Sequence, residues 1–452
     1  MDPTQKIDPN KTMLTDMQNL QDPLRTPAMG AVDLGKTSAM DAFAPGGRAL
    51  AIEVIPGRTA TMANGPAREQ FLLELHAGGS GGVGIRTPLN LGLVIDRSGS
   101  MEGPPLEYVK QACSHVVDML NQDDVLSIVT FEQMVDVLMP PQRVTNKQMI
   151  KEGISHILAG NTTNLYEGMR VGFQQVIAGE QPGRATRLVV LTDGDPTEGI
   201  KNFQSIVGQA AEFKSRGITC TFLGFGPDYN EELLAAMAKR SGGNYYYIPR
   251  PEMIPEVFRT EMEKLLTTIA RNLKLDLKLA RWVSMRGPEQ ADSGEVTVSM
   301  ADMERGSTIQ QVIDLEFPNH PLGHYRVAGG RLSYDDGVTG RTESVDVDLV
   351  LEFSPDKARY SAPVEPRVAQ ASQIQMASRA VEKTIMGLKT QQISAAGAMQ
   401  ELQKTQALLL SQGRTQEAQE VTMALRALQS GDAGAAEKTL MGTMVNLDQG
   451  KV

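Results

Sequence analysis

Short apolar runs alternate with amphipathic helical segments between residues 89 and 270. The runs LNLGLVID, RLVVLTD and ITCTFLGFG are almost wholly apolar, as expected of parallel strands that are buried on both faces. Helical apolar stripes separate these runs, for example over residues 105–120 and 203–217. Strand and helix alternating at this spacing predict a doubly wound, mostly parallel α/β sheet.

A different period begins at Leu273. Apolar and polar residues alternate strictly there, which is typical of an antiparallel sheet with one solvated face. Five segments have this pattern: 273–279, 295–300, 309–317, 324–334 and 344–353.

Two strand-like segments, 49–56 and 69–77, also precede the α/β region. Seven short strands suffice for a sandwich, whereas an isolated hairpin is only marginally stable. We therefore expect residues 49–80 and 273–353 to form one antiparallel β-sandwich, with the α/β domain, residues 86–270, inserted into it. The alternative is that the early strands form a small separate hairpin.

The two ends of the chain differ from its middle. Residues 1–46 carry five prolines and no persistent period, which predicts a flexible N-terminal arm. Residues 366–452 show apolar residues at helical spacing, and Gly413 and Gly431 break them into three or four helices. We interpret this C-terminal helical region as a bundle that packs on the sandwich; the alternative is an oligomerisation or partner-docking module.

Composition excludes several classes of function. The net charge is −10, so the chain has no electrostatic reason to bind nucleic acid, although a net charge does not exclude a local basic patch. No run of eighteen apolar residues occurs and the N-terminus has no apolar signal segment, which predicts a protein with no membrane span. The two cysteines fit a reducing compartment, and we expect a cytoplasmic location. The oligomeric state stays open.

Oxygen-bearing side chains gather around the ends of the apolar strands. Asp96, Ser98 and Ser100 lie at and directly after one strand end, where an open α/β sheet places its ligands. Thr163 lies in a loop just before a predicted helix, and Asp193 ends another apolar strand. Because these loops adjoin elements of one sheet, the side chains can meet at one edge. Carboxylates and hydroxyls are hard ligands that suit Mg²⁺.

These motifs resemble the von Willebrand factor type A family with an intact metal-ion-dependent adhesion site. The similarity covers about residues 86–270, and the flanking sandwich and helical tail are similar in architecture to bacterial intracellular members. Asp96, Ser98 and Ser100 occupy the first motif, Thr163 in TTNLYEGM the second, and Asp193 in LTDG the third.

The resemblance implies how such a site works. Ser98, Ser100 and Thr163 would reach a divalent ion through their hydroxyls, and Asp96 and Asp193 would hold it directly or through water. The ion would be Mg²⁺, Mn²⁺ or Ca²⁺. A free coordination position would be filled by a Glu or Asp of a partner protein. A metal that only stabilises the loops is the alternative.

Three functions are compatible with such a site. The first is a non-enzymatic, metal-dependent protein-binding scaffold or assembly factor in the cytoplasm, which by resemblance could work with an AAA+ ATPase system. The second is a secreted or surface adhesion protein. The third is a Mg²⁺-dependent hydrolase, which would need a nucleophile or general base beside the ion; no such residue stands out.

The other charged residues near the motifs are interpreted as ordinary surface groups. Arg97, Asp195 and Glu198 are expected to face water. His320 and His324 lie four residues apart, but Pro321 and Gly323 interrupt the segment, which argues against a helical pair of metal ligands.

Overall fold

A computed structural model describes residues 48–78, 86–287 and 294–451 of the chain. All of these residues belong to the same compact unit. The predicted N-terminal arm, residues 1–46, lies outside the described residues.

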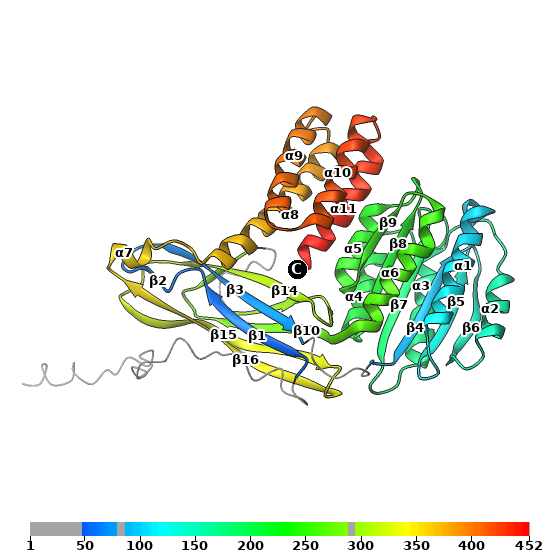
Figure 1. Ribbon diagram of the computed structural model, residues 1–452, viewed down its shortest axis with the longest axis horizontal. Helices are drawn as coiled ribbons and strands as arrows, with labels where there is room; N and C mark the ends of the chain where they lie inside the picture. Colours follow the sequence, from blue (N-terminus) through cyan, green and yellow to red (C-terminus); the bar gives the residue numbers. More distant parts are fainter. Residues whose placement is uncertain (1–47, 79–85, 288–293, 452) are drawn as a thin grey trace, which may run out of the picture. The chain divides into compact units, whose positions relative to one another are not determined.

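A six-stranded, mostly parallel sheet forms the α/β part (Figure 1). Its order is β6-β5-β4-β7-β8-β9, and every neighbouring pair is parallel except β5 and β6 at one edge. The strands are β4 (Leu89–Asp96), β5 (Val125–Phe131), β6 (Val135–Arg143), β7 (Ala185–Thr192), β8 (Thr219–Phe225) and β9 (Tyr245–Ile248). This confirms the predicted doubly wound class.

Helices cover both faces of this sheet, which explains why its central strands are mostly apolar. Every residue of β4, β5 and β7 is buried. One face carries α1 (Pro104–Met119), α2 (Lys147–Ser155) and α6 (Ile254–Thr267). The other carries α3 (Leu165–Ala178), α4 (Phe203–Ser215) and α5 (Glu231–Ser241). Two short 3₁₀ turns are η2 (Gly99–Met101) and η3 (Pro251–Met253).

Two further sheets combine strands from before and after the α/β part. The first has the order β1-β3-β14-β11, where β3 pairs with the whole of β14. Its strands are β1 (Leu50–Pro56), β3 (Ala67–Ala77), β11 (Ser284–Arg286) and β14 (Thr308–Phe317). The second has the order β12-β10-β15-β16-β2, with β13 paired to β10. Its strands are β2 (Ala60–Met62), β10 (Thr268–Leu279), β12 (Gly294–Ser299), β13 (Met303–Glu304), β15 (Gly323–Asp336) and β16 (Arg341–Ser354).

The two sheets enclose one apolar core, so they form a sandwich. Phe71, Leu73 and Leu315 of the first sheet pack in the same buried cluster as Leu275 and Leu349 of the second. The strand pairs are antiparallel apart from β2 and β16. Three short strands, β2, β11 and β13, were not predicted, because two or three residues are too few to show a period.

Four helices follow the sandwich, after a single turn, α7 (Lys357–Tyr360). They are α8 (Pro366–Lys389), α9 (Ala395–Ser411), α10 (Thr415–Gln429) and α11 (Ala433–Asp448). Gly413 and Gly431 adopt positive φ at two of the breaks, as their place in the sequence predicted. Val368 of α8 is buried against the outer face of the first sheet. Leu440 of α11 shares a core with α5 of the α/β part, a contact the sequence did not predict.

No helix among the described residues has the length and hydropathy that a bilayer-crossing segment needs.

Candidate metal site

The predicted site residues lie at the carboxyl edge of the parallel sheet. Asp96 is the last residue of β4, and Asp193 follows the last residue of β7. Because β4 and β7 are adjacent and parallel, both carboxylates emerge at the same edge. The chain turns sharply after β4 into η2, which carries Ser100.

Hydrogen bonds join the two strand ends. The Ser100 hydroxyl donates to Asp193 Oδ1 at 2.8 Å, and the Ser98 hydroxyl lies 3.4 Å from the same oxygen. The two serine hydroxyls are 3.1 Å apart. The amide of Ser98 donates to Asp96 Oδ1 at 2.8 Å, which closes the turn around that carboxylate. Four of the five predicted residues therefore form one cluster of oxygens.

The loop that carries Thr163 packs against both of these loops. The amide of Gly99 donates to the carbonyl of Asn161 at 3.1 Å. A Cβ placed on Gly194 would lie 3.6 Å from the Thr163 hydroxyl oxygen, so this hydroxyl borders the residue after Asp193. Thr163 itself is buried, and its amide donates to the Thr197 hydroxyl at 2.9 Å. The structure thus brings all five predicted residues to one edge; their role as metal ligands stays a prediction.

One residue that contacts the cluster, Thr192, was not predicted from the sequence. The hydroxyl of Thr192 donates to Asp96 Oδ2 at 2.6 Å, so both Asp96 oxygens accept a hydrogen bond. The sequence feature that could have identified Thr192 is its position directly before Asp193. It is the last residue of β7, and its side chain points to the neighbouring strand end. Thr192 orients a carboxylate rather than adding an oxygen to the cluster.

The electrostatics of the cluster favour a cation. Burial raises the pKa of Asp96 to about 7; hydrogen bonds from Thr192 and Ser98 oppose this increase, and the Asp193 charge adds to it. Burial also raises the pKa of Asp193, against the Ser100 hydrogen bond. Among the described residues, no basic side chain forms an ion pair with either carboxylate. Two buried carboxylates without a counter-charge are destabilising unless a proton or a cation joins them.

The donor set fits a hard divalent ion. Carboxylate and hydroxyl oxygens suit Mg²⁺, Mn²⁺ and Ca²⁺, whereas soft ligands are absent from the cluster. Both cysteines of the chain, Cys113 and Cys220, are buried in helix and strand positions away from these loops. Asp96, Ser98, Ser100, Thr163 and Asp193 are the residues that would hold such an ion.

Arg97 differs from the expectation that it is a solvated loop charge. Its guanidinium donates to Asp136 of β6 at 2.8 Å and lies 3.6 Å from Glu132, and its side chain is 17% exposed. It therefore ties the loop after β4 to the neighbouring edge strand. Asp195 is exposed, as predicted, and Glu198 is half-buried.

Another group of metal-type ligands is already balanced by an arginine. Glu53, Glu74 and His76 of the first antiparallel sheet have ligand atoms within 4.8 Å of one another. Arg367 of α8 donates to Glu53 at 2.9 Å and to Glu74 at 3.1 Å, so its guanidinium supplies the positive charge.

The two histidines of the NHPLGHY segment do not act together either. His320 stacks on Trp282 and His324 pairs with Glu352.

Fold and site together define a doubly wound α/β domain with a cluster of acidic and hydroxyl oxygens at its carboxyl edge. Residues 90–260 match the model of the von Willebrand factor type A domain, and the chain contains this domain. Domains of this family are typically metal-dependent protein-interaction modules.

Three relatives illustrate the range of the similarity. An uncharacterized protein of Synechocystis sp. is 29% identical over 305 residues, covering 63% of this chain and 70% of the relative. The uncharacterized protein YfbK of Escherichia coli is 29% identical over 198 residues, covering 43% of this chain and only 34% of that protein. A solved structure, a von Willebrand factor type A protein from Catenulispora acidiphila, has a TM-score of 0.65 at 16% identity, covering 83% of this chain and 89% of that one. That similarity shows a shared fold, which extends well beyond the α/β part.

Proposed function

We propose that this protein is a divalent-metal-dependent protein-binding module, an intracellular scaffold or assembly factor without enzymatic activity. In this proposal Asp96, Ser98, Ser100, Thr163 and Asp193 hold Mg²⁺, or Mn²⁺ or Ca²⁺ in its place. The ion captures a Glu or Asp side chain of a partner protein. The observation that carries the proposal is the convergence of two buried carboxylates and two serine hydroxyls at adjacent strand ends, without a basic partner among the described residues.

The chemistry of the cluster supports capture of a carboxylate. Five oxygen ligands leave one position of the octahedral shell of a hard dication open, and the three neutral hydroxyls among them donate less electron density to the ion than carboxylates would. Water fills such a position in the free protein. A partner carboxylate that replaces this water adds a charge-assisted contact, and the partly buried setting strengthens it.

Two other functions make different demands on the same residues. A hydrolase needs a nucleophile or general base poised beside the ion. Ser98, Ser100 and the Asp193 carboxylate that their hydroxyls contact are all ligands of the ion in this proposal, so none of them is left free to act as nucleophile or base. An adhesion protein would use the same cluster outside the cell, so subcellular fractionation separates that function from the scaffold. Cooperation with an AAA+ ATPase system belongs to the scaffold proposal and is tested by co-purification.

The capture step can be tested with a defined probe. Protein-bound Mn²⁺ enhances the relaxation of water protons, and this signal decreases when another ligand replaces a bound water. We expect a short peptide that contains one Glu to decrease it, and the same peptide with Gln in place of Glu to leave it unchanged. A Glu peptide that leaves the signal unchanged contradicts carboxylate capture, even where Mn²⁺ itself binds.

A matched pair of threonine variants distinguishes loss of a metal ligand from a general change in the loop. Thr163→Ala removes a proposed ligand, and we expect it to weaken Mn²⁺ binding and abolish the peptide effect. Thr162→Ala alters the adjacent residue, whose hydroxyl is buried without a hydrogen-bond partner in the described part of the chain. This variant should bind both Mn²⁺ and peptide as the wild type does. Equal behaviour of the two variants would remove Thr163 from the site.

A further inference from the structure

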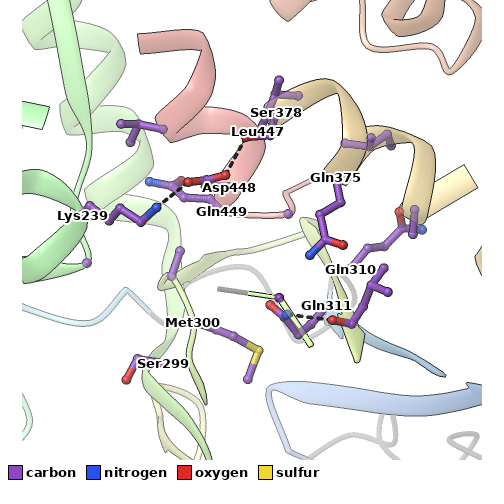
Figure 2. A pocket seen from close by; sticks show the side chains of 18 of the residues that line it. Lys239, Ser299, Met300, Gln310, Gln311, Gln375, Ser378, Leu447, Asp448 and Gln449 are labelled. Atoms are coloured by element: carbon purple, nitrogen blue, oxygen red, sulfur yellow. Dashed lines mark hydrogen bonds and ion pairs between the residues drawn. The ribbon is translucent and has the colours of Figure 1, made fainter. Parts of the chain in front are cut away.

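A cavity of about 600 Å³ lies at the opposite edge of the α/β domain from the candidate metal site. Residues at the C-terminal ends of α4 and α5 line it, together with residues of β14, α8 and α11. In an α/β sheet the helices run antiparallel to the strands, so their C-terminal ends lie away from the carboxyl edge. Figure 2 shows that Gln375 of α8 and Met300, directly after β12, face this space from different elements.

The cavity concentrates positive charge in an acidic protein. Its lining includes five basic side chains, Lys214, Lys239, Arg240, Arg379 and Arg414, and two acidic ones, Glu382 and Asp448. The chain as a whole has a net charge of −10. The lining therefore has the opposite sign to the rest of the molecule.

Two of the five cations are already paired. Lys239 donates to Asp448 at 2.7 Å, and Asp448 also accepts from Ser378 of α8, so this bridge joins α5, α11 and α8 (Figure 2). Arg414 pairs with Glu417. Lys214, Arg240 and Arg379 form no ion pair with any residue in the described ranges. Three elements, α4, α5 and α8, thus each present one unpaired cation to the cavity.

The ammonium group of Lys214 is the strongest evidence that the cavity binds an anion. Its Nζ atom is buried and has no hydrogen-bond partner among the described residues. It lies beneath Gly242, where an added Cβ would come within 2.9 Å of it. The carboxylate of Asp302 is near enough for the Lys214 charge to lower its pKa, but Asp302 accepts a hydrogen bond from Arg187, at 2.5 Å, and none from Lys214. A buried ammonium group without a partner is costly, and an anion in the cavity would satisfy it.

We propose that this cavity binds a phosphorylated small molecule of about nucleotide size, whose phosphates contact Lys214, Arg240 and Arg379. The volume is within the range of small-molecule sites. A phosphate group carries nearly two charges and three acceptor oxygens, so a diphosphate or triphosphate matches three separate cations better than one carboxylate does. Arginine forks also suit phosphate geometry. The amide of Gln375 and the apolar side chains of Met300 and Ile374 provide contacts for the rest of such a ligand.

Calorimetric titration of the full chain with ATP, ADP, pyrophosphate and citrate tests this site. EDTA in the buffer and an Asp193→Asn background keep the candidate metal site out of the measurement. We expect ATP or ADP to bind, pyrophosphate to bind more weakly, and citrate to bind least. No binding of any probe at about 1 mM would overturn the proposal, since ligand sites usually reach tighter affinities. Citrate binding as tightly as ATP would overturn the phosphate assignment.

Matched charge variants show whether the cavity itself binds. Arg240→Gln with Arg379→Gln removes two exposed charges from the lining, and we expect affinity to decrease by about tenfold or more, as for loss of charge-assisted contacts. Arg281→Gln with Arg341→Gln removes the same charge from exposed positions on the sandwich. This control should change affinity by less than about twofold at physiological salt, where distant surface charges are screened. An equal decrease in both double variants would mean non-specific attraction and would contradict the site. Lys214→Met should also weaken binding, without loss of thermal stability in the free protein.

Discussion

At the scale of single residues, the candidate metal site depends on two carboxylates that share one hydroxyl-lined cluster. Asp193→Asn removes one charge while its side chain can still accept from Ser100. We expect Mn²⁺ affinity to decrease by more than the roughly 10–100-fold typical of residues behind a metal ligand. Thermal stability in EDTA should not decrease, because the like-charge repulsion with Asp96 is relieved.

The control for this prediction lies two residues further along. Asp195→Asn makes the same chemical change at an exposed position of the same loop. Calorimetric titration with Mn²⁺ should give nearly wild-type affinity for it. If Asp193→Asn also binds Mn²⁺ normally, the metal-site assignment is wrong.

Thr192 offers a second test at this scale, because its hydroxyl orients the Asp96 carboxylate without being a proposed ligand itself. Thr192→Val keeps the shape of the strand end but removes the 2.6 Å hydrogen bond to Asp96. We expect a decrease in Mn²⁺ affinity of about 10–100-fold. Thr186→Val changes the same strand at its other end and should leave the affinity unchanged. Equal affinities of the two variants would show that Thr192 has no positioning role.

Some contacts of the candidate site could be predicted from the sequence and others could not. The convergence of Asp96, Ser98, Ser100 and Asp193 was predictable, because parallel strands end at a common edge. The role of Thr192 was not, since a strand residue can face either side and only the pairing register decides. The pairing of Arg97 with Asp136 depends on how the edge strand folds back, which no local pattern encodes.

At the scale of elements, α3 begins directly after the Thr163 loop, so the position of this helix against the sheet also places that loop. Its N-cap, Asn164, accepts a hydrogen bond from the amide of Glu167. Gly172 lets the helix lie against β4 and β7: an added Cβ would collide with Val94 and come within 3.3 Å of Leu188. The small residue on this helix face therefore positions the loop that carries Thr163.

Gly172→Ala should consequently destabilise the fold. Overpacking costs about 1–3 kcal/mol, which exceeds the helix-propensity gain of about 0.5–1 kcal/mol. Gly208→Ala in α4 is the matched control, because nothing lies within 4 Å of its added Cβ. That variant should be more stable than the wild type by about 0.5–1 kcal/mol. Urea unfolding measures both, and a stabilised Gly172→Ala would contradict the close packing of α3.

Element boundaries differ from the predicted ones where neighbours decide them. β6 runs from Val135 to Arg143 through Pro140 and Pro141, which an edge strand tolerates. β10 begins at Thr268, directly after α6 ends at Thr267, although the α/β domain was predicted to extend to residue 270. There is no glycine or proline between them, so only the sheet pairing ends the helix.

At the scale of the whole molecule, the division of the chain into folding units stays a prediction. A fragment of residues 86–270 contains the entire matched domain and all six strands of its sheet, so we expect it to unfold cooperatively by itself. A fragment of 273–353 should not fold. It lacks β3, which lies between β1 and β14 in the first sheet, and with it the core residues Phe71, Leu73 and Leu75. Cooperative unfolding of 273–353 would mean that the strands before residue 80 are dispensable.

A buried ion pair couples the inserted domain to the sandwich. Arg187 of β7 donates to Asp302, in the segment between β12 and β13, at 2.5 Å, and Asp302 also accepts from the amide of Asn272. Burial would raise the pKa of Asp302, but the charges of Arg187 and Lys214 and the hydrogen bond from Asn272 together outweigh it, and the pKa lies below its usual value. Because the folded-state pKa is lowered, the stabilising contribution of Asp302 is present at neutral pH and is lost as the pH falls.

Asp302→Asn should therefore destabilise the protein strongly and in a pH-dependent way. Leaving Arg187 buried without its partner costs about 3–5 kcal/mol at pH 7. The difference from the wild type should begin to shrink at about pH 4, the ordinary pKa of an aspartate in the unfolded chain, and continue to shrink down to the lowered pKa of folded Asp302. Asp276→Asn breaks an exposed pair with Lys274 and should cost less than about 1 kcal/mol. Chemical unfolding at several pH values gives both numbers. Two variants of equal stability at pH 7 would show that the Arg187–Asp302 pair does not hold the inserted domain to the sandwich.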